Sequence, residues 1–278
     1  MGPKILVSDF DGTLAYDDRI PEAVSRALTA LVDSGWDLIL ATGRIFASVR
    51  PHLPSLPTTK PLILYDGARI VSTQGEVLHE RLLASATASE ALRLGWEAGL
   101  EIQVFGDEEI LVPPGDGAST RYFRRVAVPI REDLTEPVVD NDVYRVIFYG
   151  DPGRVRRLAE HLREGLGAAA AAVTLAGDTF LDVLAPGVSK GAALERLLAA
   201  TGRPERLVCA GDHHNDRELL LLADLAAVPD DADEDLREIS HFTFPSASKG
   251  GFVDLVRELL RSDPFIPVVD SEAGQSYS

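Results

Sequence analysis

Two aspartates that stand two residues apart near the N-terminus carry the strongest chemical signal in the sequence. Asp9 and Asp11 follow the apolar run at residues 5–7, which is typical of a buried strand, and a Gly-Thr turn comes directly after them. In an open parallel sheet, ligands bind beyond the carboxyl ends of the strands. Two carboxylates this close repel each other unless a cation or a shared proton lies between them, and a hard divalent ion such as Mg²⁺ resolves the repulsion. The alternative interpretation is a strand end followed by an Asx-type turn.

Three further polar motifs follow predicted strands or begin predicted helices. They read ATGR at residues 41–44, VSKG at residues 188–191 and GDHHND at residues 211–216. Taken singly, Thr-Gly, Lys-Gly and Gly-Asp pairs are usually turns and helix caps. Their order along the chain, each beside a predicted strand or helix, indicates a single site assembled from distant segments.

The flanking segments alternate between buried strands and helices. Strands are predicted at residues 37–41 and 61–65, with a helix at 21–34 that ends at Gly35 and a short helix reaching about residue 49. From Gly187 onward the same alternation returns, with helices at 189–200, 216–223 and 251–261 and strands at 207–210 and 225–228. The pattern predicts an α/β fold with a Rossmann-like, doubly wound parallel sheet, whose loops share one edge.

The middle of the chain has a different pattern. Short alternating runs at residues 101–105 and 143–148 are separated by predicted helices at 89–98 and 154–166, which indicates a half-exposed antiparallel sheet with helices. The alanine run at 168–172 is expected to end a helix. We therefore predict a discontinuous core at 1–81 and 186–262, an inserted α+β cap at 82–185, and a loosely ordered tail at 263–278.

Composition narrows the classes of partner. The chain has 278 residues and a net charge of −17, which argues against nucleic acid or an anionic membrane as a partner. Its single cysteine, Cys209, lies in an apolar run and is expected to be buried packing rather than a nucleophile. No apolar run is long enough to span a bilayer, and the N-terminus enters a strand directly. We expect a cytoplasmic protein, and the sequence gives no indication of its oligomeric state.

Taken together, the four motifs resemble those of the haloacid dehalogenase (HAD) superfamily of phosphohydrolases. The placement of the insertion between the second and third motifs is similar to the Cof-type branch, which has a C2B-type cap. The resemblance implies a Mg²⁺-dependent phosphatase acting on a small phosphorylated metabolite, with a sugar phosphate as the leading candidate. The same fold also hosts phosphomutases and phosphotransferases, and a non-catalytic module that binds a phosphorylated metabolite is a third alternative.

The resemblance also implies a role for each motif residue. Asp9 would be the nucleophile and Asp11 the acid and base, while the Asp9 side chain, the Asp11 carbonyl and Asp212 would hold the metal. The predicted phosphoryl and substrate contacts come from the second, third and fourth motifs: Thr42, Gly43, Arg44, Lys190 and Asn215. Asp216 would lie behind the metal site and orient Lys190 or a water molecule.

Several residues leave alternatives open. Arg44 is assigned equally to a substrate contact and to an ion pair with a neighbouring carboxylate. His213 and His214 invite a zinc site, but adjacent side chains diverge and the oxygen-rich surroundings favour magnesium. Asp66 stands where the family usually has asparagine. The basic stretch at residues 121–125 is interpreted as a solvated helix face in preference to a substrate contact.

Overall fold

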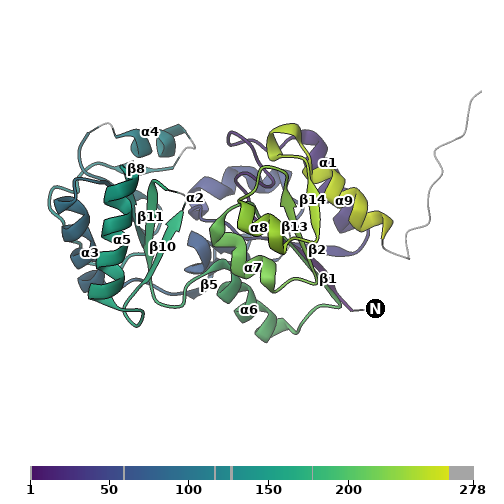
Figure 1. The fold of residues 1–278 in the computed structure, drawn as a ribbon. Helices are drawn as coiled ribbons and strands as arrows, with labels where there is room; N and C mark the ends of the chain where they lie inside the picture. Colours follow the sequence, from purple (N-terminus) through teal and green to yellow (C-terminus); the bar gives the residue numbers. More distant parts are fainter. Residues whose placement is uncertain (1, 59, 116, 126–127, 177, 263–278) are drawn as a thin grey trace, which may run out of the picture.

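The computed structural model describes residues 2–58, 60–115, 117–125, 128–176 and 178–262, and it folds into two lobes that lie side by side (Figure 1). One lobe, which we call the core, contains both the N-terminal strand and the last described helix. The other, which we call the cap, is formed by the middle of the chain. The predicted tail at 263–278 lies outside the described residues. No helix in the described part of the chain is both long and apolar enough to cross a membrane.

The core is built on a five-stranded sheet in which every paired neighbour is parallel. Its strand order is β14-β13-β12-β1-β2. The strands are β1 (Lys4–Ser8), β2 (Trp36–Leu40), β12 (Arg206–Ala210), β13 (Leu225–Pro229) and β14 (Phe242–Phe244). The prediction of a doubly wound parallel α/β sheet is confirmed.

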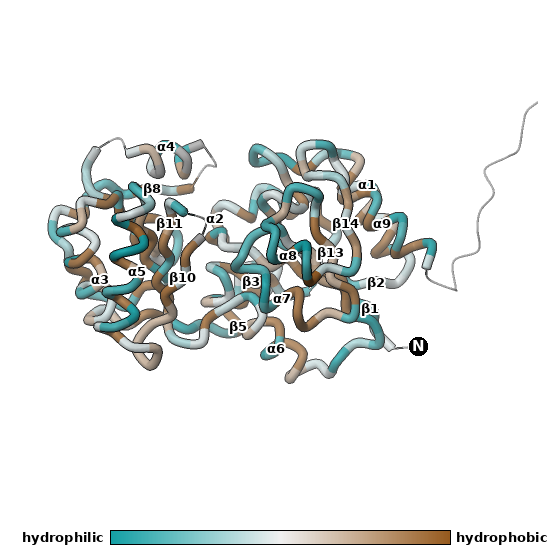
Figure 2. The backbone as a smooth tube through the Cα atoms, viewed as in Figure 1, coloured by the Kyte–Doolittle hydropathy of each residue, from teal (hydrophilic) through white to brown (hydrophobic). Residues whose placement is uncertain are grey.

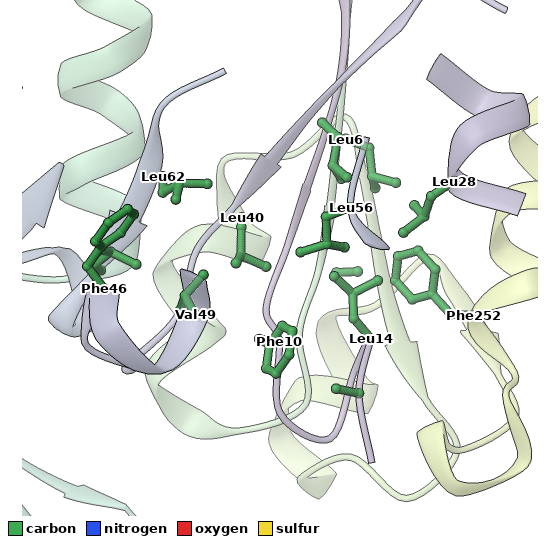
Figure 3. Close-up of a cluster of buried hydrophobic side chains, with 14 of the residues drawn as sticks. Leu6, Phe10, Leu14, Leu28, Leu40, Phe46, Val49, Leu56, Leu62 and Phe252 are labelled. Carbon is green, nitrogen blue, oxygen red and sulfur yellow. The ribbon is translucent and has the colours of Figure 1, made fainter. Parts of the chain in front are cut away.

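Alternating side chains explain why helices cover both faces of this sheet. Successive residues of a strand point to opposite faces, so Leu6 of β1 packs toward one helical layer and Val7 toward the other. The first layer contains α1 (Glu22–Asp33) and α9 (Phe252–Arg261), and Figure 3 shows Leu28 and Phe252 on the Leu6 side. The second layer contains α6 (Lys190–Thr201), α7 (Arg217–Leu221) and α8 (Glu234–Ile239).

Buried apolar strands form the centre of both lobes, and polar helix faces lie outside (Figure 2). In the core, a small antiparallel sheet adjoins the five-stranded sheet beyond β2. It contains β3 (Leu62–Leu64), β4 (Arg69–Val71) and β5 (Val77–Glu80), and a parallel bridge from Ala41 to Ile63 joins it to the end of β2. The connecting helical turns are α2 (Phe46–Val49), η1 (Arg50–Ser55) and η2 (Tyr65–Gly67).

The cap is a six-stranded, largely antiparallel sheet with helices. Its strand order is β10-β11-β9-β6-β7-β8, with only β7 and β8 paired in parallel. The strands are β6 (Glu101–Phe105), β7 (Ile110–Leu111), β8 (Ile130–Arg131), β9 (Arg145–Tyr149), β10 (Ala172–Ala176) and β11 (Phe180–Leu184). The helices are α3 (Ser85–Glu97), α4 (Ala118–Arg125) and α5 (Pro152–Leu166). Helices α3 and α5 lie on the side of the sheet away from the core (Figure 1). The fold is therefore the predicted α/β core with an α+β cap, and the domain bounds at 81/82 and 185/186 stay predictions.

Some local predictions are wrong. The alanine run does not end a helix, because α5 stops at Leu166 and Gly167 follows with φ +72°, in the region that favours glycine. Ala172 then begins β10, which pairs with β11. The predicted helix at 216–223 begins instead as the 3₁₀ turn η3 (His214–Asp216) and continues as α7. Several short elements, among them β4, β5, α8 and β14, were not predicted.

Candidate active site

An ion-pair chain joins the first and third motifs at the carboxyl edge of the core sheet. Asp9 directly follows β1, and its backbone N–H donates to the Ala210 carbonyl oxygen at 2.9 Å. Lys190 begins α6, a start fixed by the Ser189 hydroxyl, which accepts a hydrogen bond from the Ala192 N–H at 3.0 Å. Lys190 Nζ lies 2.7 Å from Asp9 Oδ1 and 2.7 Å from Asp216 Oδ1. The structure thus brings the predicted nucleophile and the predicted lysine into direct contact.

Burial controls the charges of this group. Burial raises the pKa of Asp9 well above its usual range against the lowering effect of Lys190, and the nearby carboxylates of Asp216, Asp212 and Asp11 raise it further. Burial opposes the charge of Lys190, yet Asp216 and Asp9 outweigh it and hold the pKa of Lys190 above its ordinary value. The lysine therefore stays positive with only 1% of its surface exposed.

The residues present fit a magnesium ion. Carboxylate oxygens of Asp9, Asp212 and Asp216 all lie within 4.8 Å of one another, the one such cluster among the residues described. Thr13 Oγ1 donates to Asp212 Oδ1 at 2.8 Å and holds that carboxylate in place. The turn after Asp11 lies very close to the Asp212 carboxylate. Gly12 in this turn has φ +79°, and a Cβ at that position would overlap the carboxylate. An all-oxygen donor set suits Mg²⁺.

The two oxygens of Asp216 are already engaged. Oδ1 accepts from Lys190, while Oδ2 accepts from the backbone N–H groups of Asp212 at 3.0 Å and His213 at 3.2 Å. Asp216 thereby fixes both the lysine and the loop that carries Asp212, which is the geometry expected of a residue behind the metal site.

The side chain of Asp11 is held by Arg44. Arg44 Nε donates to Asp11 Oδ2 at 2.7 Å and Arg44 Nη2 donates to Asp11 Oδ1 at 2.6 Å, a bidentate pair. Arg44 Nη1 also donates to Asp18 Oδ1 at 2.6 Å, and the guanidinium lies 4.5 Å from the centre of the Phe10 ring. Of the two roles considered for Arg44, the structure shows the ion pair with neighbouring carboxylates.

Thr42 and Gly43 line the same cavity as Asp9 and Lys190. Thr42 is 1% exposed, and its hydroxyl accepts a hydrogen bond from the Arg44 N–H at 3.2 Å. A Cβ at Gly43 would lie 2.9 Å from Asp66 Oδ2, which is closer than real Cβ contacts come. Glycine at position 43 therefore lets the Asp66 carboxylate approach the backbone next to Thr42.

The two adjacent histidines contact different carboxylates. His213 Nδ1 is hydrogen bonded to Asp212 Oδ2, and this bond raises the pKa of His213 to about 9 despite partial burial. His214 Nδ1 lies 3.5 Å from Asp235 Oδ2 on the other side of the loop. Their rings diverge as expected for neighbouring residues, so the pair does not form one zinc site. Cys209 is buried in the core, as predicted.

Sequence reasoning missed a charged cluster between the lobes. Asp66, in the left-handed region at φ 53°, accepts from Asn215 Nδ2 at 2.8 Å and pairs with Arg145 of the cap strand β9. Arg145 Nη1 is also 3.3 Å from Asp182 Oδ1 on β11. Charged residues inside the otherwise apolar runs at 145–149 and 180–184 were the available signal. Asn215, predicted to contact substrate, here binds Asp66.

Two cavities meet at this cluster. An inner cavity of about 230 Å³ lies over the motif residues, which are Asp9, Asp11, Thr42, Gly43, Arg44 and Lys190, and cap residues such as Phe105 and Arg145 complete its lining. An outer cavity of about 830 Å³ separates the lobes and shares four lining residues with the inner one: Asp66, Asp182, Lys190 and Asn215. Arg121 and Arg124 are exposed and line neither cavity. The side chains of Tyr122 and Arg125, in the same basic stretch, lie outside the described part.

Comparisons with known proteins agree with this geometry. The family model described as haloacid dehalogenase-like hydrolase matches residues 6–256. An HMP-PP phosphatase of Enterobacter sp. (strain 638) is 33% identical over 221 residues, which cover 78% of this chain and 80% of that protein. The HMP-PP phosphatase of Escherichia coli (strain K12) is 30% identical over 220 residues, with the same coverage of 78% and 80%.

Solved structures show the same fold at lower identity. A haloacid dehalogenase-like hydrolase from Bacteroides thetaiotaomicron has a TM-score of 0.80 and 21% identity, covering 92% of this chain and 99% of that one. A sugar phosphatase of HAD subclass IIB has a TM-score of 0.77 and 18% identity, covering 92% and 98%. With a matching model over almost the whole described chain, this protein belongs to the haloacid dehalogenase-like hydrolases, in the Cof-type branch.

Proposed function

We propose that this chain is a Mg²⁺-dependent phosphatase that hydrolyses a small phosphorylated metabolite through an aspartyl-phosphate on Asp9. Its family and its phosphatase relatives make it a phosphoric monoester hydrolase. The observation that carries the finer proposal is the buried ion pair of Lys190 with Asp9 and Asp216 in the inner cavity. It places a fixed positive charge beside a carboxylate oxygen that faces the cavity.

The residues divide the reaction into two balanced steps. The Asp9 carboxylate attacks phosphorus as the bond to the leaving oxygen breaks, and Asp11 gives that oxygen its proton. Asp11 then takes a proton from water, whose oxygen attacks phosphorus and breaks the bond to Asp9. Lys190 and Thr42 would contact the phosphoryl oxygens throughout. Arg44 donates to both carboxylate oxygens of Asp11 in the structure, so one of these two bonds must break before Asp11 carries the proton. Asp9, Asp212 and the Asp11 carbonyl would hold Mg²⁺, which would supply charge neutralisation.

The size of the inner cavity supports a small substrate. Its volume of about 230 Å³ is below the roughly 300–1,000 Å³ of pockets for drug-sized ligands. Sugar phosphates remain the candidates proposed from sequence, and one structural relative is a sugar phosphatase. HMP-PP is the second candidate, because the curated relatives act on it.

Replacing the nucleophile tests the mechanism. Asp9→Asn keeps the shape of the side chain but removes the attacking carboxylate, so we expect the release of inorganic phosphate to fall at least about 10³-fold. Asp33→Asn, at the exposed end of α1, is the matched control and should keep the parent rate. The assay measures phosphate released from HMP-PP, sugar phosphates, nucleotides, and flavin and pyridoxal phosphates, with Mg²⁺ and after chelation.

The outcomes separate the alternatives. Activity that survives Asp9→Asn would show that the nucleophile is wrongly assigned, and activity unaffected by chelation would exclude the metal requirement. A phosphomutase or phosphotransferase would move phosphate to another hydroxyl without releasing it. If the parent protein hydrolyses no phosphate ester with Mg²⁺ present, the remaining alternative is a non-catalytic module that binds a phosphorylated metabolite.

A further inference from the structure

A tight hairpin turn holds Asp18 in place beside the site. The Tyr16 N–H donates to the Arg19 carbonyl oxygen at 3.0 Å, and the Arg19 N–H donates to the Tyr16 carbonyl oxygen at 3.1 Å. Between them, Asp17 and Asp18 have φ values of 49° and 61°. A two-residue hairpin turn with positive φ at both central positions favours glycine, asparagine and aspartate. The turn therefore fixes the backbone from which the Asp18 side chain reaches Arg44.

Two side chains donate to the same oxygen of Asp18. Arg44 Nη1 lies 2.6 Å from Asp18 Oδ1, and His52 Nε2 lies 3.0 Å from it. An ionised carboxylate only accepts hydrogen bonds, so His52 Nε2 carries a proton and donates it to this bond. The His52 ring, which belongs to η1, packs against Phe10 with the ring centres 4.9 Å apart. His52 is thereby held in place, and it fixes the oxygen that Arg44 contacts.

Arg44 joins two carboxylates in different surroundings. Its Nε and Nη2 donate to Asp11, which lines the inner cavity, and its Nη1 donates to Asp18. Neither Asp18 nor His52 lines the inner or the outer cavity. Burial opposes the charge of Arg44, but its hydrogen bonds to Asp11 and Asp18 and their charges outweigh burial and hold the pKa of Arg44 above its ordinary value. Asp18 and His52 therefore reach the reacting groups only through a charged Arg44.

Proton transfer at Asp11 must change this arrangement. In the proposed reaction Asp11 carries a proton before the leaving oxygen departs, and a protonated carboxyl oxygen donates instead of accepting from Arg44. The Arg44 side chain is only 7% exposed, so little water is available to replace a lost carboxylate contact. A buried cation without a partner is strongly unfavourable. Asp18 is the second carboxylate that remains in contact with the guanidinium.

We propose that Asp18, fixed by His52, is a positioning residue that retains Arg44 while Arg44 releases one oxygen of Asp11 for proton transfer. The inference rests on the proposed phosphatase activity and adds the residues that prepare its proton donor. Without the charge of Asp18, Arg44 has Asp11 as its only carboxylate among the described residues. The guanidinium then stays on both oxygens of Asp11, and the proton donor is blocked.

Two esters with different leaving groups test this role. 4-Nitrophenolate is a stable anion and leaves without a proton, whereas benzyl alcohol leaves from benzyl phosphate only with the proton that Asp11 gives. Asp18→Asn keeps the shape of the side chain and an acceptor oxygen but removes its charge. We expect kcat/KM for benzyl phosphate to fall about 10-fold or more, and kcat/KM for 4-nitrophenyl phosphate to stay within about threefold of the parent.

A second variant and a control complete the test. His52→Phe keeps a ring against Phe10 but removes the Nε2 donor, and it should lower kcat/KM about threefold for benzyl phosphate alone. The double variant should lose no more than Asp18→Asn, since both changes act through Arg44. Glu22→Gln removes an exposed carboxylate at the start of α1 and should match the parent on both esters. If Asp18→Asn does not fold, His52→Phe decides.

Binding of inorganic phosphate separates positioning from damage to the cavity. Its inhibition constant should change by less than about twofold in both single variants, because neither Asp18 nor His52 lines the cavity. An unchanged kcat/KM for benzyl phosphate, an equal loss on both esters, or additive losses in the double variant would each overturn the inference. In these cases hydrolysis of 4-nitrophenyl phosphate that requires Asp9 would leave the proposed function intact. If the parent hydrolyses no ester with Mg²⁺ present, the proposed function fails and the inference fails with it.

Discussion

At the scale of single residues, the candidate site contains several charged side chains that are almost fully buried. Lys190 is paired with two buried carboxylates at once, those of Asp9 and Asp216, and each of the three would be unfavourable alone. Asp182 has no comparable partner, because the nearest cation, Arg145, is shared with Asp66. The phosphoryl end of the site therefore keeps an excess of negative charge, which a bound cation such as Mg²⁺ would offset.

The pKa of Asp182 predicts a pH-dependent cost to stability. The ordinary value is 3.8 and the folded value is about 6, so between these the folded protein keeps a proton that the unfolded chain has released. The contribution of Asp182 to the free energy of unfolding therefore falls as the pH rises through this window, by roughly 3 kcal/mol in total. Asp182→Asn removes this dependence.

Urea unfolding of the parent and of Asp182→Asn at pH 4.5 and pH 7 measures the effect. We expect the variant to gain stability relative to the parent on going to pH 7. An equal difference at both pH values would contradict a raised pKa.

At the scale of elements, the start of α6 depends on its contact with the turn η2. Gly67 has φ +103°, and a Cβ there would overlap the Ser189 carbonyl, one residue before Lys190. The turn and the helix therefore approach as closely as a residue without a side chain allows. This contact sets the position of Lys190 at the start of α6.

Gly67→Ala should damage both stability and turnover. The new methyl must push the Ser189 backbone away, so we expect a loss of more than about 3 kcal/mol in the free energy of unfolding and a lower kcat as Lys190 moves. Gly35→Ala is the matched control, since Gly35 has φ +94° but open space around it, and it should cost only about 1–2 kcal/mol of backbone strain. Equal losses in the two variants, measured by urea unfolding, would show that the contact is unimportant.

Elements of the core were predictable where local pattern and tertiary role agree. The buried runs that became β1, β2 and β12 are continuous and apolar, as parallel strands covered on both faces must be. The alanine run was misjudged because alanine favours helix, whereas pairing with β11 decides the outcome at Ala172. The three-residue strand β14 is too short to show periodicity.

The residues of the candidate site were likewise predictable only where a local motif marks them. Asp9, Thr42, Lys190 and Asp212 were predicted as site residues because each stands in a motif at a strand end or helix start. Arg145 and Asp182 lie inside cap strands, and their importance depends on how the cap sheet faces the core. No local pattern encodes that placement, so a sequence shows only a charge in an apolar run.

At the scale of the whole molecule, the pair of Asp66 and Arg145 links the two lobes directly. Asp66 belongs to the core and Arg145 to the cap, and both are buried. Arg145 also lies 4.2 Å from the centre of the Phe105 ring, so it is fixed within the cap while it reaches across. The ion pair therefore holds the cap sheet against the core beside the inner cavity.

Arg145→Met should loosen the closed arrangement, because it removes the cation and leaves Asp66 facing the cap without a partner there. We expect a larger radius of gyration by small-angle X-ray scattering and a KM raised several-fold. Arg156→Met removes an exposed ion pair with Asp178 within the cap and should change neither quantity. A variant at Arg145 with an unchanged radius of gyration would show that other contacts hold the lobes together.

The strand order of the core also determines when the protein can fold during synthesis. β1 is made first, but one of its two neighbours, β12, follows about 200 residues later. The cap strands β6 to β11 leave the ribosome before β12 and need no partner outside their own stretch of chain. On a growing chain the cap sheet can therefore form before the core sheet is complete, and Asp9 can pair with Lys190 only after residue 190 has been made.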